Sequence, residues 1–153
     1  MKKTFFLADE SATLQLGQQL SKHLSPGLVV ALVGELGAGK TTLARGMLRG
    51  LGITERIKSP TYTIVEAYDC PQFTVFHFDC YRVSKPESLR EIGLDQYFTE
   101  RDVCLIEWPE HGQGVLPPAD VTMNLTMDQG ARQVVVQGHT ARGHAFVGEL
   151  NYR

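Results

Sequence analysis

The chain has 153 residues and a formal net charge of −2, with an isoelectric point near 6.2. This length suits one folded domain with a substantial core and excludes a catalytic domain joined to a second folded module, so we expect residues 1–153 to form a single domain. The balanced charge provides no global basic field, which disfavours a protein that binds nucleic acid tightly by itself.

The first predicted element is a strand at the N-terminus. Residues 1–8 begin like a secretory signal, but their apolar run stops at Asp9 and Glu10, well short of a signal sequence. No stretch approaches the roughly 20 apolar residues of a membrane span. The cysteines lack C-x-x-C spacing, which favours a reduced cytoplasmic protein with buried, unreactive thiols; they are Cys70, Cys80 and Cys104.

A helix is predicted to follow this strand. Asp9 or Ser11 can cap its N-terminus, and we expect it to run to about Leu24. Leucines repeat every four residues along it, at Leu16, Leu20 and Leu24, which predicts a stripe that faces the core. The Pro-Gly pair at positions 26 and 27 then interrupts the helix before the next strand.

The most specific motif is a glycine-rich loop at residues 34–42. Its sequence, Gly-Glu-Leu-Gly-Ala-Gly-Lys-Thr-Thr, matches the phosphate-binding pattern G-x-x-x-x-G-K-[ST]. Residues 28–33 before it are apolar on both alternating faces, as a central parallel strand must be. Residues 41–51 after it predict a helix, ended by Gly50 and Gly52. The order of strand, loop and helix therefore predicts a protein that binds a nucleoside triphosphate.

Each residue type in this loop suits a triphosphate. Gly34, Gly37 and Gly39 allow backbone conformations in which consecutive N–H groups converge on phosphate oxygens. Lys40 supplies a positive charge for the β- and γ-phosphates, and the Thr41 hydroxyl is placed to bind Mg²⁺. The helix that starts near Lys40 adds the positive end of its dipole to the same anion.

The remaining elements predict a mixed α/β fold. Residues 61–68 and 73–79 read as two strands of a hairpin. Residues 86–98 predict a helix that starts at a proline, and residues 103–106 predict a strand that is apolar on both faces. Three short strands are expected near residues 121–127, 133–137 and 145–150. We therefore expect a sheet that is parallel at its centre and antiparallel toward one edge.

Two carboxylates end hydrophobic strands and are candidates to complete the site. A phosphate loop needs an acidic partner that orients Mg²⁺ and positions the attacking water. The carboxyl ends of parallel strands line the ligand crevice of such sheets, so Asp79 and Glu107 can both face the phosphates, although an ordinary surface carboxylate is the alternative for each. His77 lies on the strand face of Asp79 and Cys80 on the other, which argues against a metal cluster there and favours a packed core histidine.

Two further features remain open from the residues alone. Residues 59–63 can form either a mobile segment that senses the γ-phosphate through a hydroxyl or simply the capped start of a strand. Trp108 directly follows Glu107, and either core packing or a place beside the site explains it equally well.

Together these motifs resemble one family, the bacterial TsaE (YjeE) ATPases of tRNA threonylcarbamoyladenosine synthesis. The resemblance covers about residues 8–125 and includes the family's order and spacing of motifs. It rests on residues 36–42 (LGAGKTT), 58–63 (KSPTYT), 77–82 (HFDCYR) and 107–109 (EWP). It implies a three-layer P-loop NTPase fold with a mixed, centrally parallel sheet.

The resemblance also implies a function. The family members are small cytoplasmic ATPases that act with two partner subunits, TsaB and TsaD, which form the threonylcarbamoyl transferase. That transferase modifies adenosine 37 of tRNAs that read codons beginning with A, so tRNA would be met only through the complex. The ATPase is similar to a device that resets the transferase between catalytic cycles. ATP and Mg²⁺ are the implied cofactors.

Carried over residue by residue, the resemblance implies roles for the motif positions. Asp79 would support hydrolysis as a base or by orienting water, together with Lys40 and Glu107 as catalytic residues. Thr41 and Glu107 would hold Mg²⁺. Contacts to the nucleotide are implied for the loop, the 59–63 switch, the tryptophan and an arginine near the adenine: Gly37, Ala38, Gly39, Lys40, Thr41, Thr42, Thr61, Trp108 and Arg132.

Three other functional classes share features with this sequence: a kinase, a GTPase and a non-hydrolysing nucleotide sensor. A small-molecule or nucleotide kinase would suit the loop and the fold class, but the sequence carries no second acceptor-binding motif and no arginine-rich lid. A GTPase is disfavoured because neither Asn124 nor Asn151 lies in an N-K-x-D sequence. A non-hydrolysing nucleotide sensor would keep Lys40 but need neither Asp79 nor Glu107. Relatives carry an aliphatic or small residue where this chain has Cys80, which leaves the argument unchanged.

Overall fold

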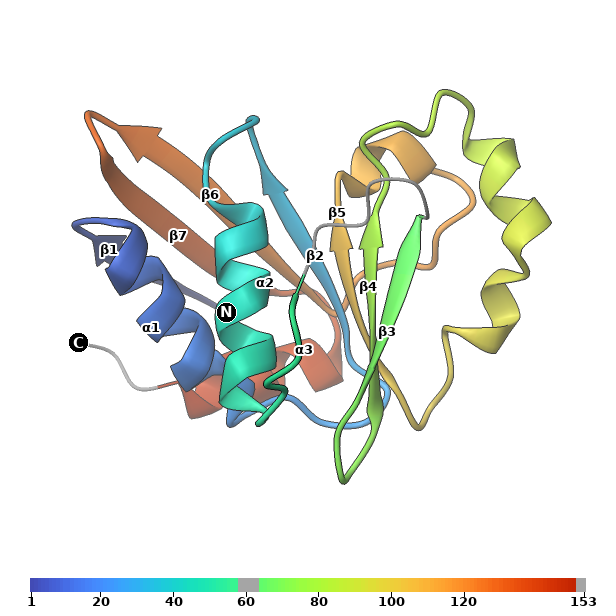
Figure 1. The fold of residues 1–153 in the computed structure, drawn as a ribbon, viewed down its shortest axis with the longest axis horizontal. Coiled ribbons are helices and arrows are strands. Elements are labelled where there is room, and N and C mark those ends of the chain that lie inside the picture. Colours follow the sequence, from blue (N-terminus) through green and yellow to red (C-terminus); the bar gives the residue numbers. More distant parts are fainter. Residues whose placement is uncertain (58–63, 151–153) are drawn as a thin grey trace.

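The computed structural model describes residues 1–57 and 64–150 (Figure 1). The predicted switch at residues 59–63, including Thr61, lies outside this range. No helix in the described part of the chain is long and apolar enough to cross a membrane. The strands are β1 (Lys2–Leu7), β2 (Val29–Gly34), β3 (Val65–Asp69), β4 (Thr74–Asp79), β5 (Val103–Glu107), β6 (Val121–Asp128) and β7 (Ala131–Gly138). The helices are α1 (Glu10–Ser21), α2 (Lys40–Gly50) and α3 (Ala141–Glu149), with 3₁₀ segments η1 (Pro86–Ile92), η2 (Leu94–Gln96) and η3 (Pro109–Gly112).

The strands form one seven-stranded mixed sheet in the order β1-β7-β6-β2-β5-β4-β3. Its four central strands, β6, β2, β5 and β4, run parallel to one another. Antiparallel pairs lie at both edges, β1 with β7 and β7 with β6 on one side and β3 with β4 on the other. The predicted parallel centre is confirmed, whereas the expectation of a single antiparallel edge is wrong.

The N-terminal half follows the sequence prediction closely. Asp9 caps α1, because its side chain accepts a hydrogen bond from the Ala12 N–H at 2.9 Å. The helix ends at Ser21, earlier than the expected Leu24. Strand β2, the glycine loop and α2 then follow in the predicted order, with β2 between two parallel neighbours.

Two element predictions need correction. Residues 86–98 form two 3₁₀ segments rather than one helix, since Gly93 between them has a left-handed φ of 72°. The strand expected at residues 145–150 is helix α3, which Thr140 caps by accepting from the Gly143 N–H at 3.0 Å. The predicted first strand of the hairpin is present as β3 from Val65, and residues 61–63 of its predicted range lie outside the described residues.

Two apolar clusters cover opposite faces of the sheet. The larger one joins the sheet to α1 and α2, which lie side by side in front of it in Figure 1, and it also includes Phe146 and Val147 of α3. The smaller one packs the 3₁₀ segments against the other face of β4 and β5; its fully buried members are Phe78, Cys80, Leu89, Cys104 and Ile106. Strand β5 is buried along its whole length, as its apolar sequence predicts.

Helices α1 and α2 approach each other through glycines. A Cβ atom on Gly17 would lie 2.8 Å from the Gly46 Cα, and a Cβ on Gly46 would lie 2.4 Å from the Leu14 carbonyl oxygen. Real side chains do not tolerate such contacts, so the spacing of the two helices depends on these glycines. Because α2 begins at the glycine loop, this packing also positions the loop.

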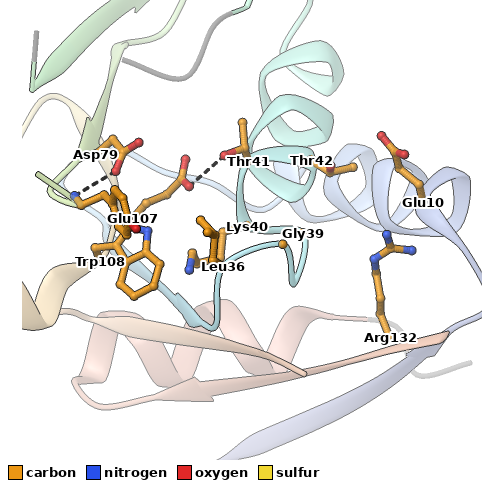
Figure 2. Close-up of a pocket in the computed structure, with 12 residues that line it drawn as sticks. Glu10, Leu36, Gly39, Lys40, Thr41, Thr42, Asp79, Glu107, Trp108 and Arg132 are labelled. Carbon is orange, nitrogen blue, oxygen red and sulfur yellow. Dashed lines mark hydrogen bonds between the residues drawn. The ribbon is translucent and has the colours of Figure 1, made fainter. Parts of the chain in front are cut away.

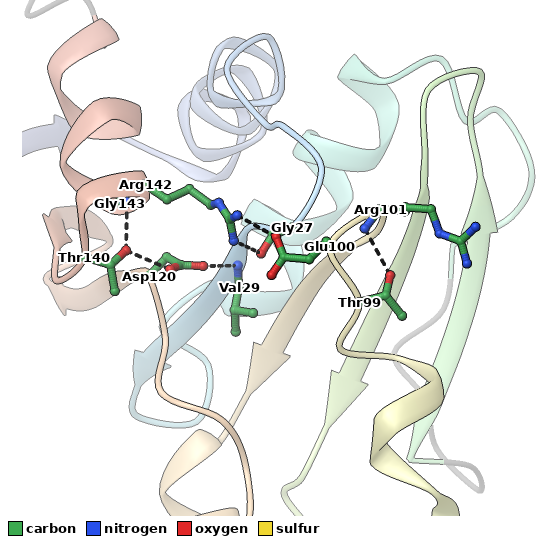
Figure 3. A network of polar contacts seen from close by, with 9 residues as sticks. All are labelled: Gly27, Val29, Thr99, Glu100, Arg101, Asp120, Thr140, Arg142 and Gly143. Carbon is green, nitrogen blue, oxygen red and sulfur yellow. Dashed lines mark hydrogen bonds and ion pairs between the residues drawn. The ribbon is translucent and has the colours of Figure 1, made fainter.

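A polar network fixes the opposite end of β2 (Figure 3). The Asp120 carboxylate accepts hydrogen bonds from the Val29 N–H at 2.8 Å and from the Thr140 hydroxyl at 2.7 Å. Arg142 donates to the Gly27 carbonyl at 2.9 Å. The starts of β2 and α3 are therefore joined through the residue that precedes β6.

The glycine packing predicts a stability difference between two helical glycines. Gly46→Ala should lower the free energy of unfolding by about 1–3 kcal/mol, because the added methyl group overpacks the α1–α2 contact. Gly148→Ala is the matched control, since its Cβ would meet only the Met1 side chain at 3.6 Å, and helix propensity should make it neutral or stabilising by up to about 1 kcal/mol. Denaturant unfolding measures both, and equal stability of the two variants would contradict the packing argument.

The cysteines provide a second prediction. Burial raises the pKa of the Cys80 and Cys104 thiols to about 12, with smaller contributions from nearby carboxylates. Cys70 is only half-buried. In the folded protein at pH 8 we therefore expect a thiol reagent to modify Cys70 first and Cys80 and Cys104 only slowly. Denaturant should expose all three thiols, and Cys70→Ser should abolish the fast reaction; fast labelling of that variant would show that the core is open.

Candidate functional site

A cavity of about 360 Å³ lies over the glycine loop, at the carboxyl ends of the parallel strands (Figure 2). It brings together nearly all of the described site residues that the sequence predicts. The exception is Ala38, which is buried and does not line this cavity. The predicted residues that line it are Gly37, Gly39, Lys40, Thr41, Thr42, Asp79, Glu107, Trp108 and Arg132.

The loop backbone has the shape that its glycines were predicted to allow. Gly34, Gly37 and Gly39 have φ angles of 156°, 83° and 107°, which residues with side chains rarely adopt. Helix α2 begins directly after Gly39, and no side chain caps it. Its first N–H groups are thus left for an anion in the cavity, where the helix dipole also favours negative charge.

Lys40 lies within the curve of the loop. Its Nζ donates to the Gly34 carbonyl and, at 3.4 Å, to the Glu35 carbonyl. The same atom lies 3.6 Å from the centre of the Trp108 ring, a cation–π distance. Burial lowers the pKa of Lys40, while the charges of Glu107, Glu110 and Asp79 oppose that shift. Acidic groups and an aromatic face therefore offset part of the cost of burying the Lys40 charge.

Thr41 and Glu107 bring two oxygen ligands together. The Thr41 hydroxyl donates to Glu107 Oε1 at 2.9 Å, although the two residues come from α2 and β5. No group of three or more His, Cys, Asp or Glu side chains in the described chain could hold a metal ion. Mg²⁺ commonly uses one or two protein oxygens and completes its shell with phosphates and water. A hydroxyl and a carboxylate beside the glycine loop fit that ion.

Asp79 lies next to Glu107 on the neighbouring strand. The parallel register of β4 and β5 pairs these two residues directly. Asp79 Oδ1 accepts a hydrogen bond from the Tyr81 N–H at 3.0 Å, and the side chain lines the cavity. Both predicted carboxylates therefore line the same cavity, with Glu107 buried and Asp79 partly exposed.

His77 is more than a packed core residue. It is fully buried, as predicted, but its Nε2 lies 2.6 Å from Glu107 Oε2. The sequence placed His77 on the face of Asp79 without identifying this partner. This partner could be identified only from the strand register, which pairs Glu107 with Asp79 and so brings Glu107 close to His77.

Trp108 has a strained backbone. Its φ and ψ of 57° and 50° are left-handed, which is uncommon for a bulky residue and also contrasts with the extended conformation favoured before proline. Its ring centre lies 5.0 Å from that of Tyr81 and 5.5 Å from that of His111. Core packing alone does not explain this tryptophan, which extends over Lys40. Tyr81 and His111 belong to the same aromatic group and were missed by the sequence reasoning.

Arg132 lies at the other end of the cavity from Asp79, with Glu10 facing it (Figure 2). A Cβ on Gly39 would be 3.4 Å from Arg132 Nε, so the arginine lies directly against the loop. That Nε is buried and has no hydrogen-bond partner among the described residues. Glu10 was not predicted as a site residue, because nothing in its helix-start sequence distinguishes it from an ordinary first-turn acid.

Comparisons with known proteins agree with this geometry. The family model "Threonylcarbamoyl adenosine biosynthesis protein TsaE" matches residues 7–134. The tRNA threonylcarbamoyladenosine biosynthesis protein TsaE of Haemophilus influenzae is 42% identical over 149 residues, 94% of each chain. The protein of the same name from Synechocystis is 44% identical over 110 residues, 69% of each chain.

The fold is likewise that of a solved relative. The crystal structure of Bacillus subtilis YdiB superposes with a TM-score of 0.83 at 29% identity, covering 97% of this chain and 93% of the other. The sequence relatives, the family model and the fold thus agree, and the chain belongs to the TsaE family.

Proposed function

We propose that this protein is a Mg²⁺-dependent ATPase of bacterial tRNA threonylcarbamoyladenosine synthesis. The observation that carries the proposal is the meeting of Lys40, Thr41 and Glu107 at one cavity over the glycine loop, with Thr41 Oγ1 and Glu107 Oε1 2.9 Å apart. Those groups are the cation, hydroxyl and carboxylate that triphosphate hydrolysis uses in P-loop proteins.

The two ends of the cavity suggest how a nucleotide would lie. Lys40, Asp79 and Glu107 gather at one end, so we place the γ-phosphate there. The nucleoside then lies toward Arg132, whose buried Nε lacks a partner in the described chain and could donate to it. Thr42, between the two ends, is suited to the remaining phosphates through the first turn of α2.

Each residue has a definite task in this proposal. Lys40 leaves its loop carbonyls and neutralises the phosphate oxygens. Thr41 and Glu107 would hold Mg²⁺, which when bound would offset the negative charge of the phosphates. Asp79 orients the attacking water or takes its proton. Trp108 shields this end of the cavity from solvent.

The partners are inferred from the family. Relatives named for threonylcarbamoyladenosine biosynthesis match most of this chain, and we propose that the protein acts in the cytoplasm on a transferase formed by TsaB- and TsaD-like subunits. ATP hydrolysis would reset that transferase between cycles, with tRNA bound by the complex. The family favours this function over a kinase. The two carboxylates at the cavity favour it over a non-hydrolysing sensor, because a sensor would need neither Asp79 nor Glu107 there.

Two substitutions should separate nucleotide binding from turnover. Lys40→Ala removes charge-assisted hydrogen bonds to the phosphates and should weaken ATP binding about 10- to 100-fold. Asp79→Ala should leave ATP affinity nearly unchanged and reduce turnover about 10²- to 10⁴-fold, since its role is confined to hydrolysis. Calorimetry and phosphate release measure the two effects.

Asp95→Ala is the control, because Asp95 is exposed in η2 and does not line the cavity. Turnover of Asp79→Ala equal to that of wild type would remove Asp79 from the mechanism. We also expect slow hydrolysis by the purified chain, because Arg132, the arginine that lines the described cavity, is at the end away from Asp79. Arg82, the arginine of the motif at residues 77–82, does not line this cavity.

The cellular role is tested by modification of tRNA over many turnovers. Purified TsaB and TsaD-like subunits should sustain threonylcarbamoyladenosine formation only when wild-type protein is present. Lys40→Ala should stop synthesis after the first cycle, while Lys22→Ala, an exposed lysine outside the cavity, should behave as wild type. Equal yields with wild type, with Lys40→Ala and without the protein would refute the resetting role and favour the kinase alternative.

A further inference from the structure

We propose that His77 is a positioning residue that fixes the Glu107 carboxylate for metal binding. The inference rests on the proposed ATPase function and extends it by one residue behind the cavity. His77 is fully buried and does not line the cavity. Any effect on the metal must therefore pass through Glu107.

The two oxygens of Glu107 have different partners. Oε2 lies 2.6 Å from His77 Nε2, and Oε1 lies 2.9 Å from the Thr41 hydroxyl. The first contact joins two adjacent strands, β4 and β5, and the second joins the sheet to α2. Because both ends of the carboxylate are held, its plane and rotamer are fixed, and Oε1 stays beside the hydroxyl that would share the metal.

The hydrogen-bonding pattern of His77 supports an orienting role. A carboxylate oxygen accepts, so Nε2 carries the proton and donates to Oε2. The other nitrogen, Nδ1, is buried without a hydrogen-bond partner in the described chain. The ring thus directs its one polar contact at Glu107.

The restraint prevents a competing arrangement. Glu107 lies close enough to Lys40 to influence its charge state, yet Lys40 Nζ is held by the Gly34 and Glu35 carbonyls and by the Trp108 ring. A Glu side chain has several rotatable bonds, and ordering it at the moment of metal binding costs entropy. With Oε2 tied to His77, the carboxylate is already ordered before a metal arrives, and it is kept from turning toward the lysine.

The test compares three variants that differ in their hydrogen-bond donor. His77→Leu removes the donor. His77→Gln carries an amide nitrogen at about the reach of Nε2, and His77→Asn carries the same group one carbon shorter. We measure binding of a non-hydrolysable ATP analogue with Mg²⁺ and with EDTA, the Mg²⁺ concentration for half-maximal hydrolysis, and thermal unfolding. His139→Leu is the control, since His139 bonds to Thr122 and does not line the cavity.

Loss of an orienting partner behind a metal ligand typically costs 10- to 100-fold in metal affinity or activity. We expect His77→Leu and His77→Asn to raise the half-saturating Mg²⁺ concentration by about this factor, with little change in analogue binding in EDTA. His77→Gln should restore the wild-type value, as His139→Leu should retain it. If His77→Leu is too destabilised to fold, the comparison of His77→Gln with His77→Asn is sufficient to test the role of His77.

Two outcomes separate this inference from the proposed function. If wild-type protein binds the analogue equally well with Mg²⁺ and with EDTA and hydrolyses no ATP, the proposed function fails. If wild type depends on Mg²⁺ but Gln, Asn and Leu share its half-saturating concentration, only the role of His77 is wrong. A loss of stability with an unchanged Mg²⁺ requirement would likewise show that His77 is purely structural.

Discussion

The site depends on the two hydrogen bonds of the Glu107 carboxylate, because they join three elements at one point. Glu107 ends β5, accepts from Thr41 at the start of α2 and contacts His77 of β4. Removing either partner would leave part of a buried carboxylate unsatisfied, at a cost of about 1–3 kcal/mol. The contact that would prepare a metal ligand therefore also fixes α2 relative to the sheet.

Strand β2 is fixed at its start and leads directly into the glycine loop of the site. The Asp120 carboxylate holds the N–H of Val29, where β2 begins, and parallel pairing holds the strand on both sides. The loop after β2 must turn through left-handed glycines before α2 starts, and the Gly17–Gly46 contact sets where that helix lies. The loop is thus defined by rigid elements on both sides, as a preformed anion site requires.

The parts of this structure that the sequence could predict are those determined by local pattern. The apolar strand, glycine loop and following helix are adjacent in the chain, so their order and the loop's conformation follow from residues 28–51. Helix α3 was mistaken for a strand, although its Thr140 cap is a local signal, because the part of this helix after residue 145 buries only Phe146 and Val147 and shows no clear helical period. The His77–Glu107 contact and the left-handed Trp108 depend on strand register and on neighbours far along the chain.

Trp108 and the loop carbonyls together hold Lys40 in place. Burial removes hydration from the Lys40 amine, and the loop carbonyls, the indole face and the nearby carboxylates compensate for part of that loss. The left-handed backbone that aims the indole at Lys40 costs about 1–3 kcal/mol. The cation–π contact, the tilted ring contact with Tyr81 and the stacking on His111 help to offset that cost.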